Sequence, residues 1–315
     1  MAAEKNFRPQ TFDDYQGQEK AKKILKIAIK AAQMKNTCLD HILIAGESGL
    51  GKSTLANIIA NESGQKIMTV SCPAIKTVGD MIDILQQVEE NSILFADELH
   101  SLRRPIQETL FLAMETFTLN ANIDGEIITQ QLPHFTLIGA TTELSGLELP
   151  MRNRFQLQIN LVPYDSERMS NIVKNVFKSM NVEITKDCAD LIAGCSRNVP
   201  RNANAFCRRV YDVALVTNEG RVTEEVIYDT MDLMDINEYG LNSIDMRYLQ
   251  LLYDNRKSTG LETIALALGT DKKSIESVVE PFLFKGGFAS KGPRGRKITQ
   301  KGVEVVELWS DAQDL

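Results

Sequence analysis

Short apolar runs alternate with amphipathic segments over the first half of the chain. Four of the apolar runs have the length and composition of buried strands: HILIA (41–45), KIMTVS (66–71), SILFADE (92–98) and HFTLIGATT (134–142). Segments with helical periodicity lie between them: KSTLANIIA (52–60), VGDMIDILQQVEE (78–90) and IQETLFLAMETF (106–117). Apolar strands that alternate with helices are typical of a parallel sheet. The pattern therefore predicts an α/β fold in which helices cover both faces of a parallel sheet.

The pattern changes after FQLQINLVP (155–163). Residues 165–236 show helical periodicity without a convincing strand, and INEYGLNS (236–243) has the composition of a linker. Residues 242–315 predict three helices and then two short strands around the basic glycine turn in GGFASKGPRGRKITQKG, which is typical of a winged helix. We therefore predict three domains: an α/β domain (1–163), a helical domain (164–238) and a winged-helix domain (239–315).

Composition narrows the class of protein. Hydrophobic residues make up 43% of the 315 residues, and no apolar run approaches the ~18 residues of a membrane span. The segment MAAEKNFRPQ lacks the apolar stretch of a secretion signal, so we expect a cytoplasmic protein without a membrane partner. The five cysteines form no CxxC pair and are interpreted as core residues rather than zinc ligands. The net charge of −7 argues against a general nucleic-acid coat but leaves room for local basic patches.

The segment GESGLGKS, residues 46–53, fits the phosphate-binding pattern G-x-x-x-x-G-K-[ST] between a predicted strand and a predicted helix. Backbone N–H groups of such a loop, together with the N-terminus of the helix behind it, bind anions. Lys52 is then expected to reach the β- and γ-phosphates of ATP, and the Ser53 hydroxyl to ligate Mg²⁺. The alternative, a chance glycine turn, is disfavoured by the strand–loop–helix context.

Two further strand ends carry side chains that suit hydrolysis. Asp97 ends the strand ILFAD and is placed to hold Mg²⁺ through water, while Glu98 could polarise the attacking water as a general base. Thr141 or Thr142, at the end of TLIGATT, could orient the same water. The alternative is that the two acidic residues cap the next helix and that the threonines simply end a strand.

The segment LPMRNRF (149–155) presents two arginines, Arg152 and Arg154, a few residues after a buried strand. An arginine that faces the γ-phosphate can raise the hydrolysis rate by ~10³–10⁵. The segment is expected on the far side of the domain from the P-loop, where it could reach the nucleotide of a neighbouring subunit. It therefore predicts a homo-oligomeric ring whose subunits complete one another's sites. The alternative is a surface ion pair or a structural fork.

Several longer blocks, between Arg8 and Thr299, carry a resemblance to one family: RPQTFDDYQGQ, LDHILIAGESGLGKSTLANIIA, ILFADELH, PHFTLIGATT, RNRF and GLETIALALGT…IESVVEPFLFKGGFASKGPRGR. Together they resemble the RuvB family of AAA+ motors, which drive branch migration of Holliday junctions. The resemblance implies an AAA+ P-loop domain, a helical lid domain and a winged-helix domain. It also implies hexameric rings around duplex DNA, recruited to four-way junctions by the partner RuvA.

The resemblance assigns roles to individual residues. The catalytic roles fall on Lys52 (Walker A), Asp97 and Glu98 (Walker B), Thr141 (sensor 1), Arg154 (the finger acting in trans) and Arg201 in SRNVPR (the lid arginine that reads the γ-phosphate). Ser53 and Asp97 are the expected magnesium ligands. The expected nucleotide-binding residues are Arg8, Tyr15, Gly17, Gly46, Glu47, Ser48, Gly49, Leu50, Gly51, Lys52, Ser53, Thr54, Tyr164 and Arg201.

One departure from the family pattern concerns the predicted hairpin at residues 118–132, within LNANIDGEIITQQLPHF. Asp124-Gly125 has the composition of a tight two-residue turn, whereas the family's hairpin is several residues longer. The short version offers mainly Ile123, Ile127 and Ile128 as apolar contacts. We therefore predict that docking to RuvA is weakened or redirected.

The segment KGPRGRK (291–297) supplies four cations on the predicted wing: Lys291, Arg294, Arg296 and Lys297. Cations on such a loop neutralise DNA phosphates and carry little sequence information. This suits a motor that must move along any sequence. The alternative is a solvated basic turn without a partner.

Two functions from different classes fit these features. The first is an ATP-driven DNA motor of the RuvB type, which the winged helix and the PRGR turn favour. The second is a DNA-bound AAA+ switch or clamp-loader-like assembly factor that does not translocate, which the short hairpin and the acidic net charge leave open. A degenerate nucleotide-binding scaffold is disfavoured because no expected catalytic position is lost.

Overall fold

The computed structural model describes residues 8–123 and 126–313 of the chain. The chain forms two compact units, each of which is described by itself. Unit 1 contains Met1–Met180 and Val199–Asn204, and unit 2 contains Asn181–Asn198 and Ala205–Leu315. This division does not test the three predicted domains, which stay a prediction.

Unit 1 is built on a five-stranded sheet in the order β2-β3-β6-β1-β7, in which all neighbours are parallel. The strands are β1 (Ile42–Ala45), β2 (Ile67–Ser71), β3 (Ser92–Asp97), β6 (Phe135–Thr141) and β7 (Leu157–Asn160). Every residue of β1 and β6 is buried, as expected for strands that are covered on both faces. The predicted parallel sheet is confirmed, and β7 is an edge strand that the pattern analysis did not include.

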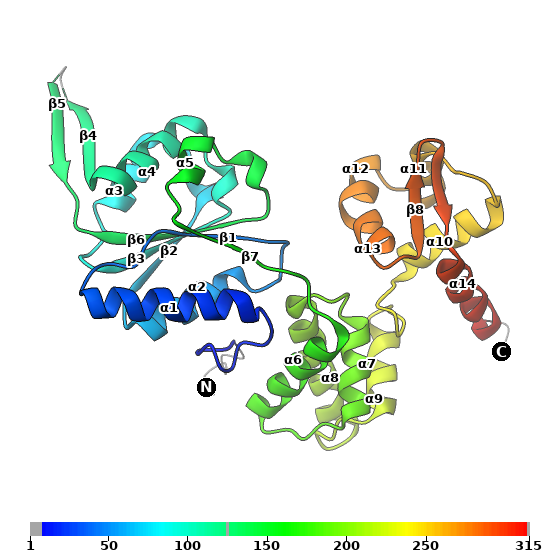
Figure 1. Cartoon of the computed structure of the whole chain (residues 1–315). Coiled ribbons are helices and arrows are strands. Elements are labelled where there is room, and N and C mark those ends of the chain that lie inside the picture. Colours follow the sequence, from blue (N-terminus) through cyan, green and yellow to red (C-terminus); the bar gives the residue numbers. More distant parts are fainter. Residues whose placement is uncertain (1–7, 124–125, 314–315) are drawn as a thin grey trace. The chain divides into compact units, whose positions relative to one another are not determined.

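Helices cover both faces of this sheet (Figure 1). On one face lie α1 (Glu19–Lys35) and α2 (Lys52–Ser63), and on the other lie α3 (Val78–Leu85), α4 (Arg104–Thr116) and α5 (Leu149–Asn153). Three short 3-10 helices follow strands or loops: η1 (Cys72–Ala74), η2 (Leu99–Ser101) and η3 (Leu144–Gly146). The unit also contains α6 (Ser166–Met180) and the first residues of α8 (Pro200–Thr217). Leu94, Leu137 and Leu110 are among the residues that form the core between the sheet and α4.

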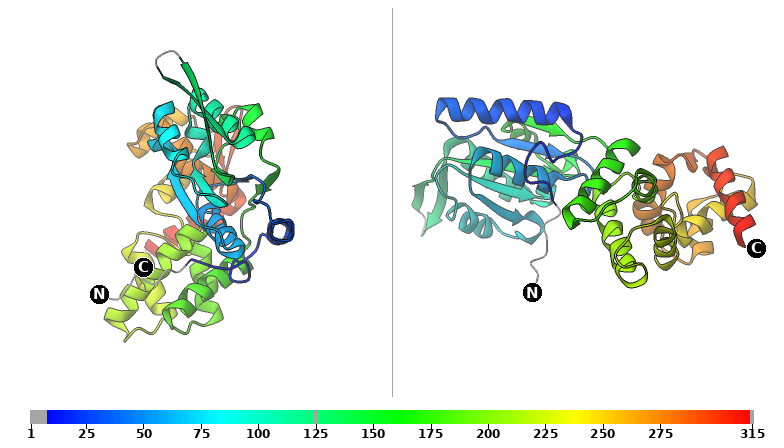
Figure 2. Two further views of the ribbon diagram at one scale, coloured as in Figure 1. Left: turned by 90° about the vertical axis from the view of Figure 1, so that its left-hand side faces the viewer. Right: turned by 90° about the horizontal axis from the view of Figure 1, so that it is seen from below.

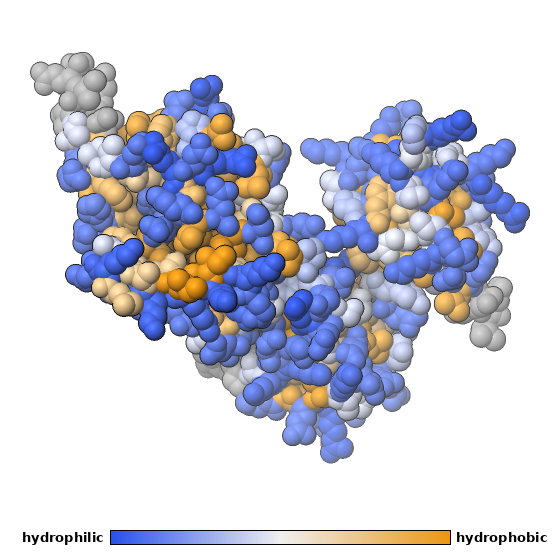
Figure 3. Space-filling model, in the orientation of Figure 1, coloured by the Kyte–Doolittle hydropathy of each residue, from blue (hydrophilic) through white to orange (hydrophobic). Residues whose placement is uncertain are grey.

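Apolar residues of helix α1 lie both on the face that packs against the sheet and on its exposed face. Ala21, Leu25 and Ile29 are buried, whereas Ile27 and Met34 are 61% and 79% exposed. Figure 3 shows apolar surface over the part of unit 1 that α1 occupies in Figure 1.

An antiparallel hairpin of β4 (Thr118–Ile123) and β5 (Glu126–Gln131) extends away from the helices and the main sheet of unit 1 (Figures 1 and 2). The predicted hairpin is therefore present. The predicted tight turn at Asp124-Gly125 lies outside the described residues.

Unit 2 begins with α7 (Lys186–Cys195), most of α8 (Pro200–Thr217) and α9 (Glu224–Leu233), with no strand among these described residues. Next come α10 (Ser243–Asn255), α11 (Leu261–Leu268), α12 (Lys272–Ser274), the π-helix η4 (Ile275–Val279) and α13 (Glu280–Lys285). The antiparallel pair β8 (Ala289–Gly292) and β9 (Gly295–Ile298) follows, and then α14 (Gln300–Gln313). The predicted strands around the basic turn are confirmed, whereas α14 was not predicted.

No helix in the described part of the chain is long and apolar enough to cross a membrane.

Candidate nucleotide-binding and hydrolysis site

The carboxyl ends of β1, β3 and β6 lie at one edge of the sheet, and the P-loop leaves from β1 there. Gly49 and Gly51 adopt φ values of 81° and 98°, which side chains rarely tolerate. A Cβ on Gly49 would lie 2.5 Å from Val199 Cγ1, and one on Gly51 would lie 3.0 Å from the Tyr15 hydroxyl. The glycines are therefore required both by the turn and by the close approach of other segments to it.

Lys52 is held inside the P-loop. It is 6% exposed, and its Nζ donates to Gly46 O at 2.7 Å and to Glu47 O at 3.1 Å. Burial lowers the pKa of Lys52, while the carboxylates of Glu98 and Asp97 act in the opposite direction. The ammonium is thus placed within the loop, bonded to oxygen atoms that phosphate oxygens could replace.

Ser53 and Asp97 meet across the start of α2 and the end of β3. Ser53 Oγ donates to Asp97 Oδ2 at 3.4 Å, and Asp97 Oδ1 accepts from Glu98 N at 3.1 Å. A hydroxyl and a carboxylate are the oxygen donors that Mg²⁺ uses at phosphate sites. The two predicted magnesium ligands therefore fit the ion by chemistry and by proximity.

Glu98 and Thr141 are linked by a histidine that the sequence analysis assigned no role. His100 Nε2 lies 3.5 Å from Glu98 Oε2, and His100 Nδ1 lies 3.1 Å from Thr141 Oγ1. Thr141 is fully buried, and Gly46 N donates to its carbonyl at 3.1 Å, which ties this strand end to the P-loop. The signal in the sequence was the histidine of DELH, two positions after the predicted base.

Residues from both ends of unit 1 close around the P-loop. The Tyr15 and Tyr164 hydroxyls lie 3.4 Å and 3.5 Å from Leu50 O, and burial raises the pKa of both phenols, so both stay protonated. A Cβ on Gly17 would lie 3.1 Å from the Tyr164 ring. Arg201 Nη1 donates to Ser48 Oγ at 3.1 Å.

The structure thus brings Tyr15, Tyr164 and Arg201 to the P-loop and places Gly17 against Tyr164, while the nucleotide-binding roles that the resemblance implies for them stay a prediction. The side chain of Arg8 is exposed, and among the described contacts only its carbonyl is bonded, to Gln10 Nε2 at 2.9 Å. A nucleotide-binding role for Arg8 stays a prediction.

Models of three RuvB domains match almost the whole chain. The Holliday junction DNA helicase RuvB P-loop domain matches residues 7–161, the RuvB AAA lid domain 164–237 and the RuvB C-terminal winged helix domain 238–307. The chain belongs to the RuvB family. This is a family of AAA+ ATPases, and its P-loop domain implies that the chain binds a nucleotide.

Curated relatives and solved structures agree with this assignment. The Holliday junction branch migration complex subunits RuvB of Campylobacter hominis and Kosmotoga olearia are each 41% identical, over 97% and 98% of this chain and 91% and 95% of the relative. The Thermotoga maritima RuvB Holliday junction branch migration motor superposes with a TM-score of 0.80 at 36% identity, covering 96% of this chain and 98% of the other. The fold expected from the RuvB resemblance is therefore confirmed.

The predicted finger of this RuvB-family chain, Arg154, lies directly after α5. Its Nη2 is 2.5 Å from Glu115 Oε2 on α4, and both side chains are 39% exposed. This is the surface ion pair that was the alternative to a finger. Exposed pairs contribute only about 0–1 kcal/mol, so the contact leaves Arg154 able to exchange Glu115 for a phosphate. The role in trans stays a prediction.

Gln107, which the sequence analysis missed, anchors the start of α5. Its buried amide donates to Leu102 O at 2.9 Å and to Gly146 O at 3.0 Å, and it accepts from Glu148 N at 3.0 Å. Because Glu148 directly precedes α5, Gln107 sets where the arginine-bearing helix begins. The signal in the sequence was a polar residue at an apolar position of IQETLFLAMETF.

Arg296 departs from the prediction that it contacts DNA. It is 7% exposed, and its guanidinium donates to both oxygens of Glu280, at 2.7 Å and 3.1 Å, and to Glu276 Oε1 at 3.1 Å. A side chain that is buried and bonded to two carboxylates is not free to bind phosphate. We therefore correct the interpretation of Arg296 to a structural cation inside the winged helix.

The other three wing cations, Lys291, Arg294 and Lys297, are exposed. Lys291 Nζ lies 3.2 Å from Glu276 Oε1, and Arg294 lies in the turn between β8 and β9. The basic surface of the wing therefore consists of three residues, one of which shares a carboxylate with Arg296.

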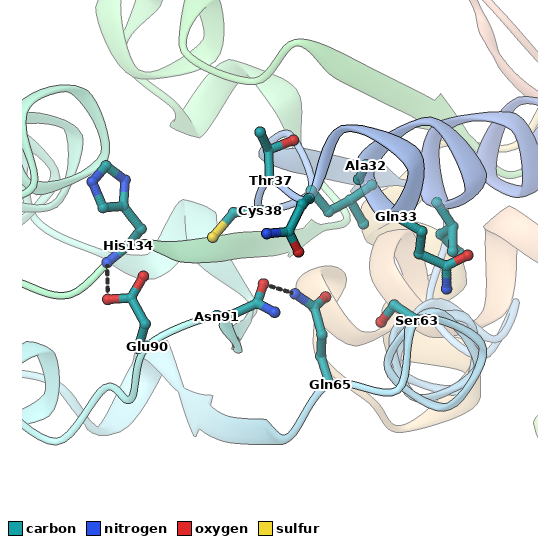
Figure 4. Close-up of a pocket in the computed structure, with 12 residues that line it drawn as sticks. Ala32, Gln33, Thr37, Cys38, Ser63, Gln65, Glu90, Asn91 and His134 are labelled. Carbon is teal, nitrogen blue, oxygen red and sulfur yellow. Dashed lines mark hydrogen bonds between the residues drawn. The ribbon is translucent and has the colours of Figure 1, made fainter.

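A polar pocket of about 610 Å³ lies at the opposite edge of the unit 1 sheet, by the starts of the strands (Figure 4). Gln65 Nε2 donates to Asn91 Oδ1 at 2.6 Å, and His134 N donates to Glu90 Oε2 at 3.1 Å. Ligands of open parallel sheets bind at the carboxyl ends of the strands. This pocket is therefore separate from the nucleotide site.

Proposed function

We propose that this chain is a cytoplasmic, ATP-driven DNA motor that promotes branch migration of Holliday junctions. The observation that carries the proposal is the meeting of Lys52, Ser53, Asp97, Glu98 and Thr141 at one edge of the sheet, in a chain matched throughout by RuvB domain models. The relatives are named as branch migration subunits, and their name supports the same activity here.

The geometry supports a division of labour during hydrolysis. Lys52 and Arg201, both at the P-loop, would bind the phosphates of ATP. Ser53 and Asp97 would hold Mg²⁺, which when bound neutralises negative charge on the β- and γ-phosphate oxygens. Glu98 would accept a proton from water as general base. Thr141, at the neighbouring strand end, would orient that water.

The RuvB family is expected to form hexameric rings. In such a ring, a neighbouring subunit would supply the arginine finger to this site. The half-exposed Arg154 directly follows α5 and pairs with Glu115 of α4, and other residues of these two helices line a groove of about 330 Å³. Phe111, Leu112, Pro150 and Met151 give that groove an apolar lining. An exposed apolar groove beside an arginine is suited to docking against a second copy. Arg154 would then act on the nucleotide of the neighbour.

The wing supports contact with duplex DNA through its backbone. Arg294 and Lys297 are exposed on and beside the turn, and neither has a described side-chain partner. Phosphate contacts of this kind position a protein without reading sequence.

We further propose that the short β4–β5 hairpin docks RuvA less tightly than a longer one would.

The experiment is an ATPase assay with no DNA, linear duplex or a four-way junction, each with and without RuvA from the same source, alongside a junction-dissociation assay. The motor predicts DNA-stimulated hydrolysis and ATP-dependent dissociation of the junction. The variant Lys52→Ala should lose both. Hydrolysis without junction movement would favour the clamp-loader-like switch, and absence of hydrolysis under all conditions would refute the proposal. Calorimetric titration with RuvA tests the hairpin: tight binding that Ile127→Ala abolishes would show that the short hairpin suffices.

A further inference from the structure

His100 lies between two side chains that the proposed hydrolysis step uses. Its Nε2 is 3.5 Å from Glu98 Oε2, and its Nδ1 is 3.1 Å from Thr141 Oγ1. Glu98 follows β3 and Thr141 ends β6, and these strands are neighbours in the sheet. The imidazole therefore spans the two strand ends at which water would be activated and oriented.

The Glu98 carboxylate determines which ring nitrogen of His100 carries the proton. A carboxylate only accepts, so Nε2–H faces Glu98, and Nδ1 accepts from the Thr141 hydroxyl at 3.1 Å. The same hydroxyl lies 2.9 Å from Glu143 O and accepts from Glu143 N at 3.0 Å. A hydroxyl has one proton and two lone pairs, so with its proton directed to His100 one lone pair is left for a water.

Glu98 needs such a partner. Among the described contacts, His100 is the one side-chain partner of its carboxylate, which is 38% exposed. The Glu98 backbone has φ 56°, a left-handed conformation that non-glycine residues seldom adopt and that is concentrated at active sites. A general base must come within about 2.6–3.2 Å of the group it deprotonates. A long, part-exposed carboxylate without a partner would seldom hold that position.

The backbone of His100 is itself fixed by close packing. A Cβ on Gly146 would lie 2.8 Å from His100 Cβ and 3.2 Å from His100 O. Gly146 O in turn accepts from the buried Gln107 at 3.0 Å. The turn that carries His100 therefore has little freedom to shift, and the ring is a rigid support for Glu98.

We propose that His100 is a positioning residue for ATP hydrolysis: it holds the Glu98 carboxylate beside the Thr141 hydroxyl so that both address one water. The ring acts through Glu98 and exchanges no proton with the substrate. The inference rests on the proposed ATPase activity and adds to it a residue outside the P-loop and the acidic pair.

The test begins with His100→Ala. Its kcat for ATP should fall by roughly 10–100-fold, the scale of a catalytic group displaced by about 1 Å. KM and the affinity for a fluorescent ADP analogue should change by less than about twofold, because the loss arises in the transition state. His100→Gln, whose amide reaches toward the Nε2 position, should recover part of kcat, whereas the shorter His100→Asn should not. His134→Ala, which removes a histidine from the opposite edge of the sheet, is the matched control and should keep the parental kcat.

A double-mutant cycle separates positioning from folding. In a Glu98→Gln background, followed by single-turnover hydrolysis, His100→Ala should cause little further loss, because its effect passes through the Glu98 carboxylate. An equal loss in both backgrounds would overturn the inference. So would a parental kcat in His100→Ala, or a joint loss of ADP affinity and thermal stability. A parent protein that hydrolyses no ATP would instead refute the proposed function.

Discussion

Replacing Arg296 with methionine should lower the free energy of unfolding of the winged helix. It should not lower the affinity for DNA. Arg296 and Glu280 are 7% and 2% exposed, and two hydrogen bonds of 2.7 Å and 3.1 Å join them. The fully buried Tyr248 donates to the same carboxylate at 3.1 Å. Removing the cation leaves Glu280 buried without a compensating charge, which costs about 3–5 kcal/mol. Out of a typical domain stability of about 5–15 kcal/mol, this is a large share.

The assay uses the protein's single tryptophan, Trp309, which packs against the core of this winged helix. Urea unfolding followed by its fluorescence should show the loss in the Arg296→Met variant. Arg294→Met, in the exposed turn of the same wing, is the matched control and should stay within about 0.5 kcal/mol of the parent. The triple variant Arg296→Met, Glu280→Leu, Tyr248→Phe should recover most of the stability, because it removes every member of the buried polar group together.

DNA binding should be affected in the opposite way to stability by these two variants. At a temperature where both variants are folded, Arg294→Met should weaken duplex binding and Arg296→Met should not. If Arg296→Met were instead as stable as the parent, within about 1 kcal/mol, and bound DNA poorly, the buried ion pair would be the wrong account. Arg296 would then return to the set of phosphate contacts.

Three further outcomes are expected. Arg154→Ala should bind ATP normally yet hydrolyse it about 10³-fold more slowly. If the arginine acts in trans, mixing this variant with Lys52→Ala should restore part of the activity. Rings shown to be mixed that recover no activity would contradict this. Replacing Arg294 and Lys297 with alanine should lower the log–log salt slope of duplex binding by roughly 2, measured by titration at several salt concentrations. Burial lowers the pKa of His41 below its ordinary value of 6.5, so on acidification the unfolded chain binds a proton at this histidine before the folded chain does. The contribution of the neutral His41 to the free energy of unfolding should be fully present above pH 6.5. As the pH falls below 6.5, the free energy of unfolding should decrease by up to about 1.4 kcal/mol per pH unit. Urea unfolding of unit 1 by circular dichroism at pH 7.5 and 5.5 checks this, and His41→Gln should show a smaller difference.

The P-loop could be predicted because its signals are local. The glycines of GESGLGKS, the strand before them and the helix after them lie within about twenty residues, and the backbone conformation they require follows from residue type. Asp97 and Thr141 were predicted for a related reason. Parallel strands bring their carboxyl ends to one edge, so a polar residue at each strand end is placed by topology alone.

The side chains that support this site escaped prediction because their partners are distant in sequence. His100 is 41 residues from Thr141, and Gln107 is 39 residues from Gly146. Which side chains meet across such distances depends on the register of β3 against β6 and on the packing of α4, which hydrophobic periodicity does not specify. The edge strand β7 and the helix α14 were missed because a short strand and a terminal helix carry weak periodic signals.

The wing shows most clearly which features the sequence alone could not predict. Residue type and the glycine turn determined that a basic hairpin would form at KGPRGRK, and this could be read from the chain alone. Only the tertiary structure decided that Arg294 faces solvent while Arg296, two residues later, is buried. The reason is that burial of a cation requires a carboxylate in the right place, and α13 and the π-helix η4 deliver Glu280 and Glu276 to that side of β9 from 16 and 20 residues away.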